Sequence, residues 1–355
     1  MNIYLFIALF TGFLGGLEVF TNFRKRFNQF HWYVFASLIC FLFIFVGFRE
    51  CGFDYNNYEA YFAALHSPFW KENATVVGVE KGYAYLNYAA NSYQGLLLGI
   101  AVVTIGLQLL FIYKYSPFPC FTIFLILGVY LYPFFMGQYR QGLAISFVLW
   151  ALLNRENKAV FFSLIGLASL FHISSLLALG VLVVPSRILK IRYYLLFLLI
   201  ALLMNLFLGS IFKSYISSLP AFVSRKLGIY AETENFSYGL NIAMLLRLVS
   251  FGILFYFKDK ISNYRYADYF LNLYFISLFI YLGFGFLPQL GGRGSIYFYY
   301  FEFILISMLL TRLYGLKRMF FFSLFAGIAF MRQFSFFKEW AEDYIPYKNF
   351  LLTLF

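Results

Sequence analysis

The residues best suited to chemistry in this sequence are three arginines at the ends of long apolar runs. Arg49, Arg140 and Arg293 each lie where such a run meets a polar stretch. A guanidinium binds a phosphate through two parallel N–H groups and keeps its proton at physiological pH. These arginines are therefore candidates for holding a phosphorylated ligand. The alternative for each is a helix-end arginine whose charge reaches the lipid headgroups.

Two titratable side chains are candidate general bases. Asp54 lies five residues after Arg49, and the alternative for this pair is a structural salt bridge. His172 is the only histidine expected at membrane depth, and histidine titrates near neutral pH. Its alternative is a buried ring that is hydrogen-bonded to a neighbour such as Ser174. Glu80 is a third candidate, better suited to orienting an arginine or a ligand hydroxyl.

The composition indicates the class of fold that positions these residues. Hydrophobic residues make up 63% of the 355 and charged residues 12%, and the mean hydropathy is +0.77, which excludes a soluble globular protein. Apolar runs of roughly 17–25 residues recur along the chain, as helices crossing a bilayer require. The net charge of +12 is dispersed among short loops, so we expect no nucleic-acid partner. The sequence thus predicts an all-α polytopic membrane protein.

We expect about 11–12 membrane segments, within a single integral membrane domain of residues 1–355. Residues 159–185 are too few for two full crossings, so we predict a broken or re-entrant segment that turns near His172. Two long outer loops are expected, at 49–94 and 213–240. The other predicted spans are 2–20, 32–48, 95–113, 117–136, 141–153, 193–212, 241–257, 268–286, 296–310 and 319–331.

The basic cluster 24–26 assigns the first loop to the cytoplasm, and the later loops then alternate. This topology places Arg49, Arg140 and Arg293 on the outer side, together with ten of the 15 acidic residues. One arginine, Arg247, falls inside a predicted span. Its expected partner is Glu302 on another span, and the alternative is a role beneath a bound phosphate.

The three cysteines, Cys40, Cys51 and Cys120, have no spacing typical of a metal site. Cys40 and Cys120 lie in apolar runs, where a small buried side chain is the expected reading. We expect neither a metal nor a cofactor.

Six short pieces, in order along almost the whole chain, resemble the EpsG family, whose members are similar to Wzy-type exopolysaccharide and O-antigen polymerases. The sequence has Phe53 where many members have a small or hydroxyl residue. The pieces are Arg49 with Gly52-Phe53-Asp54-Tyr55 and Tyr58, Glu80-Lys81-Gly82-Tyr83, Arg140-Gln141, Phe171-His172-Ile173-Ser174, Arg293 with Tyr297, and Pro346-Tyr347-Lys348-Asn349.

The resemblance implies a GT-C-like or Wzy-like inverting glycosyltransferase of the bacterial inner membrane, with its active site facing the periplasm or exterior. Donor and acceptor would be glycans linked to undecaprenyl diphosphate, for an exopolysaccharide, O-antigen or capsule. Membrane lipids, a chain-length regulator and a flippase are the other implied partners. The implied roles are diphosphate binding by Arg49, Arg140 and Arg293, general base catalysis by Asp54 or His172 with Glu80 beside them, and substrate contacts by Tyr55, Tyr58, Gln141 and Tyr297.

Two other functions fit parts of the pattern. A flippase or transporter of lipid-linked oligosaccharides would use an intramembrane Arg247–Glu302 pair and a broken helix at His172. A lipid-linked glycan ligase would use similar outer arginines and a histidine. The long outer loops and the enrichment of acidic residues on one side favour the polymerase.

Overall fold

The computed structural model describes residues 2–21, 23–208 and 240–353. The predicted outer loop 213–240 lies, except for Leu240, outside the described residues. The chain forms two compact units, each described here by itself: unit 1 is Met1–Leu176 with Leu310–Phe355, and unit 2 is Leu177–Leu309. The expectation of a single domain stays a prediction.

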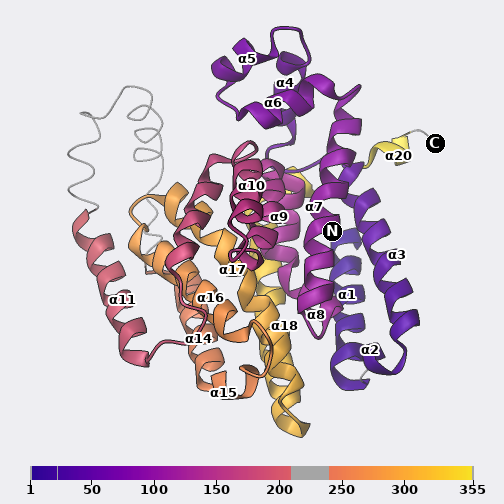
Figure 1. Ribbon diagram of the computed structural model, residues 1–355. Helices are drawn as coiled ribbons and strands as arrows, with labels where there is room; N and C mark the ends of the chain where they lie inside the picture. Colours follow the sequence, from indigo (N-terminus) through magenta and orange to yellow (C-terminus); the bar gives the residue numbers. More distant parts are fainter. Residues whose placement is uncertain (1, 22, 209–239, 354–355) are drawn as a thin grey trace. The chain divides into compact units, whose positions relative to one another are not determined.

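Unit 1 is built from helices throughout its described part (Figure 1). They are α1 (Asn2–Thr21), α2 (Phe23–Arg26), α3 (Asn28–Gly47), α4 (Tyr55–Leu65), α5 (Trp70–Val77), α6 (Lys81–Ala89), α7 (Tyr93–Tyr115), α8 (Pro119–Ile126), the π-helix η1 (Leu127–Gly137), α9 (Tyr139–Leu153), α10 (Lys158–Ser169), α18 (Gly315–Glu339), α19 (Ala341–Tyr344) and α20 (Phe350–Thr353).

Unit 2 is also helical, and two helices cross its boundaries: the 3₁₀ helix η2 begins in unit 1 and α17 ends there. Its elements are η2 (Ile173–Val183), α11 (Ile191–Leu203), the π-helix η3 (Met204–Leu208), α14 (Ile242–Tyr256), α15 (Lys258–Ile261), α16 (Ala267–Gly283) and α17 (Pro288–Thr311).

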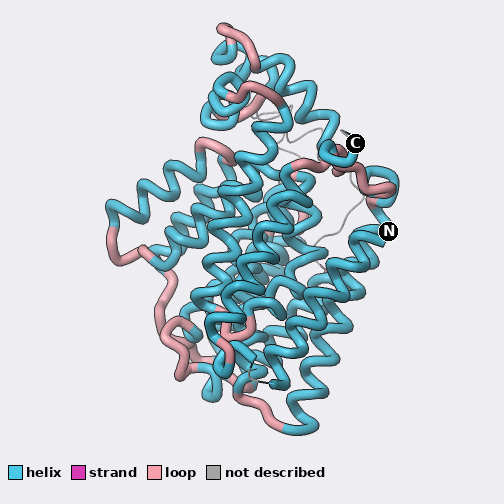
Figure 2. The backbone as a smooth tube through the Cα atoms, turned by 90° about the vertical axis from the view of Figure 1, so that its right-hand side faces the viewer, coloured by secondary structure: helices cyan, strands magenta, loops and turns pink. Residues whose placement is uncertain are grey.

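The predicted all-α membrane architecture is confirmed. Seven helices of the described chain are long and apolar enough to cross a membrane, and five apolar helices of 10–17 residues accompany them. The backbone follows helices joined by loops, and no described residue lies in a strand (Figure 2). The chain is therefore an integral membrane protein. Which loops face the cytoplasm stays a prediction, as does the crossing of each shorter helix.

The helix break expected near His172 is present, because α10 ends at Ser169 and η2 begins at Ile173. The loop predicted at 49–94 contains three short helices, α4, α5 and α6, which lie together beyond the ends of α7 and α9 (Figure 1). Five of the ten candidate site residues lie in these helices, directly before them or at the break, namely Asp54, Tyr55, Tyr58, Glu80 and His172.

The predicted bounds of two helices and the predicted burial of one cysteine were wrong. Helix α17 begins at Pro288, so most of the expected outer turn 287–295 is helical. Its glycines suggested a turn, but they allow close packing: a Cβ at Gly291 would lie 2.8 Å from the Phe284 carbonyl oxygen. Helix α18 continues to Glu339, eight residues past the predicted end. Cys40, expected to be buried, is exposed on α3.

The span before α9 contains a π-helix, because Pro133 lies inside it and has no N–H to donate. The wider winding ends at Gly137, and the Gln138 N–H then bonds the Pro133 carbonyl at 2.7 Å. Helix α9 starts directly afterwards. Its first residues are thereby fixed at the end of the bundle that carries α4 and α6.

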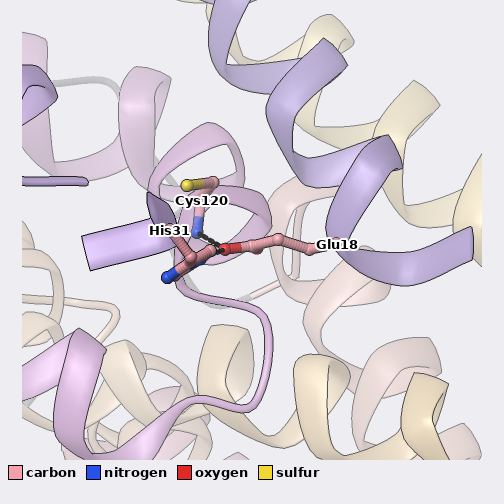
Figure 3. Close-up of side chains that lie close together, drawn as sticks. All are labelled: Glu18, His31 and Cys120. Atoms are coloured by element: carbon pink, nitrogen blue, oxygen red, sulfur yellow. Dashed lines mark hydrogen bonds and ion pairs between the residues drawn. The ribbon is translucent and has the colours of Figure 1, made fainter. Parts of the chain in front are cut away.

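A buried carboxylate ties α1 to α3 and α8 (Figure 3). Glu18 Oε1 accepts from His31 Nε2 at 2.6 Å and from the Cys120 N–H at 3.1 Å, while Oε2 accepts from the Phe121 N–H at 3.1 Å. The Glu18 and His31 side chains are 0% exposed. The negative charge therefore lies at the N-terminus of α8, where backbone N–H groups and the helix dipole stabilise it.

We expect Glu18→Ala to lower the free energy of unfolding by about 3–5 kcal/mol, because it leaves His31 and two α8 N–H groups without their partner. Unfolding of the purified protein in detergent measures this. The matched control is Glu156→Gln, because the Glu156 side chain is 88% exposed beside Arg155. Its loss should stay within about 0.5 kcal/mol. Equal losses in the two variants would contradict a structural role for Glu18.

Candidate active site

The C-terminal segment that follows α19 holds the Arg49 loop in place. The Glu50 N–H donates to the Lys348 carbonyl at 3.0 Å, and the Phe350 N–H donates to the Phe48 carbonyl at 2.8 Å. An isolated β-bridge pairs Arg49 with Asn349. The first and last pieces of the motif pattern, about 300 residues apart in the sequence, thus lie side by side.

Arg49 is buried, with 1% of its surface exposed. Its Nε donates to the Met136 carbonyl at 2.9 Å and its Nη1 to the Val46 carbonyl at 2.6 Å. Its guanidinium carbon lies 5.5 Å from the centroid of the Tyr139 ring. Among the described residues Nη2 has no hydrogen-bond partner, and Arg49 forms no ion pair with Asp54. Arg49 therefore joins the ends of two helices through their carbonyls, and its Nη2 amino group is left without a partner among the described residues.

Phe53 fills space over a glycine. It follows Gly52, whose φ of 129° favours glycine. The Phe53 ring lies 4.8 Å from the Trp340 ring, measured between centroids. A Cβ at Gly137 would lie only 2.3 Å from a Phe53 ring carbon. The large side chain is thus accommodated by the absence of a side chain at Gly137.

We expect Gly137→Ala to destabilise the protein by about 1–3 kcal/mol and to lower activity, because the added methyl group must push Phe53 aside. Thermal unfolding in detergent measures the change. The matched control is Gly166→Ala in α10, where a Cβ would meet no atom within 4 Å. That variant should be neutral or more stable, because alanine favours a helix over glycine. A loss in Gly166→Ala as large as that in Gly137→Ala would contradict the steric explanation.

Arg140 and Glu80 form an ion pair at the start of α9. Arg140 Nη1 lies 2.7 Å from Glu80 Oε2, and the two side chains are 19% and 20% exposed. The other Glu80 oxygen accepts the Ile173 N–H at 3.2 Å. Arg140 Nε is 3.5 Å from the Tyr58 hydroxyl. Glu80 therefore links the first turn of α9 to the helix break after α10.

Three buried tyrosines pack beneath this ion pair. The Tyr83 and Tyr139 hydroxyls share a hydrogen bond of 2.8 Å, and the centroids of the Tyr58 and Tyr139 rings are 4.1 Å apart. The Arg140 guanidinium carbon lies 5.6 Å from the Tyr58 ring centroid and 5.3 Å from that of Tyr83. Such contacts orient a cation and offset part of its loss of water.

His172 lies at the same helix break, one residue before the N–H that Glu80 accepts. Its Nδ1 is 2.6 Å from the Ser174 hydroxyl oxygen, which fixes the orientation of the ring. Helix α6 is fastened to the break as well, because the Gly82 N–H donates to the Leu170 carbonyl at 3.0 Å. A Cβ at Gly82 would lie 2.7 Å from that carbonyl oxygen, so glycine permits the contact.

The tyrosines of this region cannot serve as bases near neutral pH. Burial, reinforced by the charges of Glu59 and Glu50, raises the pKa of Tyr55 to about 12. Burial also raises the pKa of Tyr83. Both phenols keep their protons and act as hydrogen-bond partners. The side chains of this region that could act as a base near neutral pH are therefore carboxylates and an imidazole.

An apolar cavity of about 430 Å³ lies beside the break. Leu86 of α6, Gly99 and Ile100 of α7, Leu143 of α9 and Phe171 are among the residues that line it. Phe171 precedes His172, and Leu143 lies one turn after Arg140. The polar cluster and the apolar cavity are therefore neighbours within unit 1.

The structure brings together most, but not all, of the predicted site residues. Asp54 is half-buried directly before α4, one turn from Tyr58, and Gln141 is buried in α9. Arg293, half-buried, and Tyr297, fully buried, belong to α17 in unit 2, so a shared site with the others stays a prediction. The residues within unit 1 are Arg49, Asp54, Tyr55, Tyr58, Glu80, Arg140, Gln141 and His172.

A comparison with protein families shows to which family the chain belongs. The family model described as the EpsG family matches residues 32–349. The chain belongs to the EpsG family. The matched range of this EpsG family member contains every site residue described above. Searches of curated proteins and of solved structures found no match.

Sequence reasoning missed two contributors to the site. Tyr139 fell between the predicted spans 117–136 and 141–153, although its place directly before Arg140 was the available signal. The Ile173 N–H gives no sequence signal, because every residue except proline has a backbone N–H.

The side chains that could hold a metal ion lie elsewhere in unit 1. Glu18, His31 and Cys120 offer ligand atoms within 4.8 Å of one another, and no other such group occurs among the described residues. Sequence analysis did not group these residues, because they are far apart along the chain. The Glu18 oxygens already accept three N–H groups, so the arrangement is accounted for by the capping of α8.

Proposed function

We propose that this EpsG family member is a polysaccharide polymerase. It transfers a growing glycan from undecaprenyl diphosphate to a sugar hydroxyl of a new lipid-linked repeat unit, at the outer face of the bacterial inner membrane. The observation that supports this most is the Arg140–Glu80 ion pair, joined through the Ile173 N–H to the His172 helix break. It combines a fixed cation, a carboxylate and an imidazole at the end of apolar helices.

Arg140 neutralises the diphosphate leaving group in this proposal. Negative charge develops on the phosphate oxygens as the anomeric C–O bond breaks, and a cation held in advance lowers the energy of that transition state. Glu80, together with the tyrosine rings, holds the guanidinium in place, and Nη2 of Arg49 is the second N–H source. Arginine suits this role because it remains charged.

We assign the general base to His172, because its ring is oriented by Ser174 at the same break that contacts Glu80. The acceptor hydroxyl gives its proton to the imidazole while its oxygen forms the new bond to the anomeric carbon. The electron pair of the broken bond leaves with undecaprenyl diphosphate, and the configuration inverts. Asp54, one turn from Tyr58, is the other candidate base.

The apolar cavity beside Phe171 fits a lipid-linked substrate. Its lining is almost entirely hydrophobic and it adjoins the polar cluster, so a ligand with a charged head and an apolar chain would satisfy both parts. The first isoprene units of the carrier lipid are the proposed occupant.

Reconstitution with undecaprenyl-diphosphate-linked repeat units as the only substrate tests the proposal. Chain lengthening, unchanged by EDTA, supports a metal-independent polymerase. Movement of the lipid across the bilayer without lengthening would instead indicate a flippase. Lengthening only after another acceptor is added would indicate a ligase.

A further inference from the structure

Arg247 of unit 2 is buried, and it forms no ion pair with any other described residue. Arg247 lies on the second turn of α14, and 8% of its surface is exposed. Its guanidinium carbon is 4.1 Å from the centroid of the Tyr281 ring and 3.8 Å from that of Tyr299. The two rings come from α16 and α17. The cation is therefore enclosed between aromatic side chains of two other helices.

Only one hydrogen bond of the Arg247 side chain is present among the described residues. Nη1 donates to the Ser295 hydroxyl oxygen at 3.3 Å, and this hydroxyl donates its own proton to the Gly292 carbonyl at 2.9 Å. The predicted pair with Glu302 is not formed, because none of the ion pairs between described residues includes Arg247. The charge is thus held by rings and one hydroxyl.

A charge removed from water is costly unless an opposite charge accompanies it. Contacts with aromatic rings recover part of that cost, and a bound anion would recover much more. Two rings lie near the guanidinium carbon, and the N–H edge of the group is the part that can donate hydrogen bonds to a ligand. This edge is the part of arginine that matches the oxygens of a phosphate.

Neighbouring side chains fix the positions of Arg247 and of the Tyr281 ring. The Tyr274 hydroxyl donates to the Arg247 carbonyl at 2.8 Å, and the Asn241 amide donates to the Tyr281 hydroxyl at 3.0 Å. Asn241 also caps α14 by accepting the Met244 N–H at 2.9 Å. Arg247 therefore lies in the second turn of α14, whose N-terminus is capped by Asn241.

We propose that Arg247 and Ser295, between the rings of Tyr281 and Tyr299, bind the phosphate of a lipid. The residues of this site all belong to unit 2. Lipid phosphate has two sources, the phospholipids of the bilayer and isoprenoid carrier lipids, and both present the same oxyanion to the guanidinium.

Native mass spectrometry of the full-length protein in detergent tests this, with phosphatidylglycerol, undecaprenyl phosphate and neutral diacylglycerol as probes. We expect at least one phosphate-bearing probe to bind more tightly than diacylglycerol, and Arg247→Met to weaken that binding at least tenfold. Preference for phosphatidylglycerol identifies a headgroup site, and preference for undecaprenyl phosphate a carrier-lipid site. Equal binding of all three probes, or unchanged binding in Arg247→Met, would overturn the proposal.

The matched control is Arg24→Met. Arg24 also lies over a ring, 4.4 Å from the Tyr113 centroid, but it donates to the carbonyls of Ser116 at 2.6 Å and Tyr113 at 2.7 Å. Its loss should leave selective phosphate binding unchanged. An equal loss of selective binding in both variants would mean that any arginine suffices, which overturns a site at Arg247.

Measurements of thermal unfolding distinguish lipid binding by Arg247 from a purely structural role of this residue. The probe that binds should raise the unfolding temperature of the wild type but not of Arg247→Met. If that variant fails to fold, Tyr299→Leu removes one ring wall and keeps the charge, and it should lose part of the shift. A lower unfolding temperature in either variant with a full ligand-induced shift would contradict the proposal.

Discussion

Arg140→Lys should lower polymer formation by at least about 100-fold, although the charge is kept. A lysine ammonium has no planar fork, so it cannot hold Glu80 and two phosphate oxygens together, and it loses the contact with the Tyr58 and Tyr83 rings. Initial rates with lipid-linked repeat units in proteoliposomes measure this effect. The amount of folded protein should equal that of the wild type, as judged by gel filtration.

The control for Arg140→Lys is Arg155→Lys. Arg155 lies just beyond the opposite end of α9, where it is 3.3 Å from the exposed carboxylate of Glu156. Its replacement should leave the rate unchanged, because Arg155 lies at the other end of α9 from Arg140 and Glu80. Full-length polymer from Arg140→Lys would exclude Arg140 from the site.

His172→Ala should lower the rate by about 10²–10⁴-fold, the usual contribution of a positioned general base. Ser174→Ala, which removes only the 2.6 Å contact to Nδ1, should have a smaller effect and alter the pH profile of the rate. Measurements from pH 5 to 9 distinguish the two.

His66→Ala is the matched control for the histidine. His66 follows α4 in the same unit, is exposed, and has its Nδ1 3.2 Å from the Asn87 carbonyl oxygen. We expect it to retain the wild-type rate. Asp54→Asn should also lose polymer if Asp54 orients the acceptor. A fully active His172→Ala together with an inactive Asp54→Asn would assign the base to Asp54 instead.

Much of the fold is predictable from the sequence because hydrocarbon allows few alternatives. A long apolar run in a membrane must be a helix, so the spans of α1, α3 and α7 follow from composition. The break at His172 follows from the number of residues between two basic loops. The start of α17 could not be predicted, because its glycines are typical of a turn. The structure shows that Gly291 instead allows close packing against the Phe284 carbonyl.

The candidate site is predictable in its members but not in their contacts. The pattern names Arg140, Glu80 and His172, and the structure adds that Glu80 joins the other two segments. The pattern does not reveal that Arg49 donates to backbone carbonyls, because every residue type has the same backbone carbonyl. Likewise, Arg247 was expected to pair with Glu302, whereas aromatic rings enclose it.

Undecaprenyl diphosphate released per glycosidic bond formed is the most direct measure of the central claim that Arg140, Glu80 and His172 form a polymerase site. In vesicles that contain lipid-linked repeat units and purified protein, the account predicts one carrier lipid released for each bond in the wild type, and almost none with Arg140→Lys or His172→Ala. Polymer growth without carrier release, or release by both variants at the wild-type rate, would contradict it.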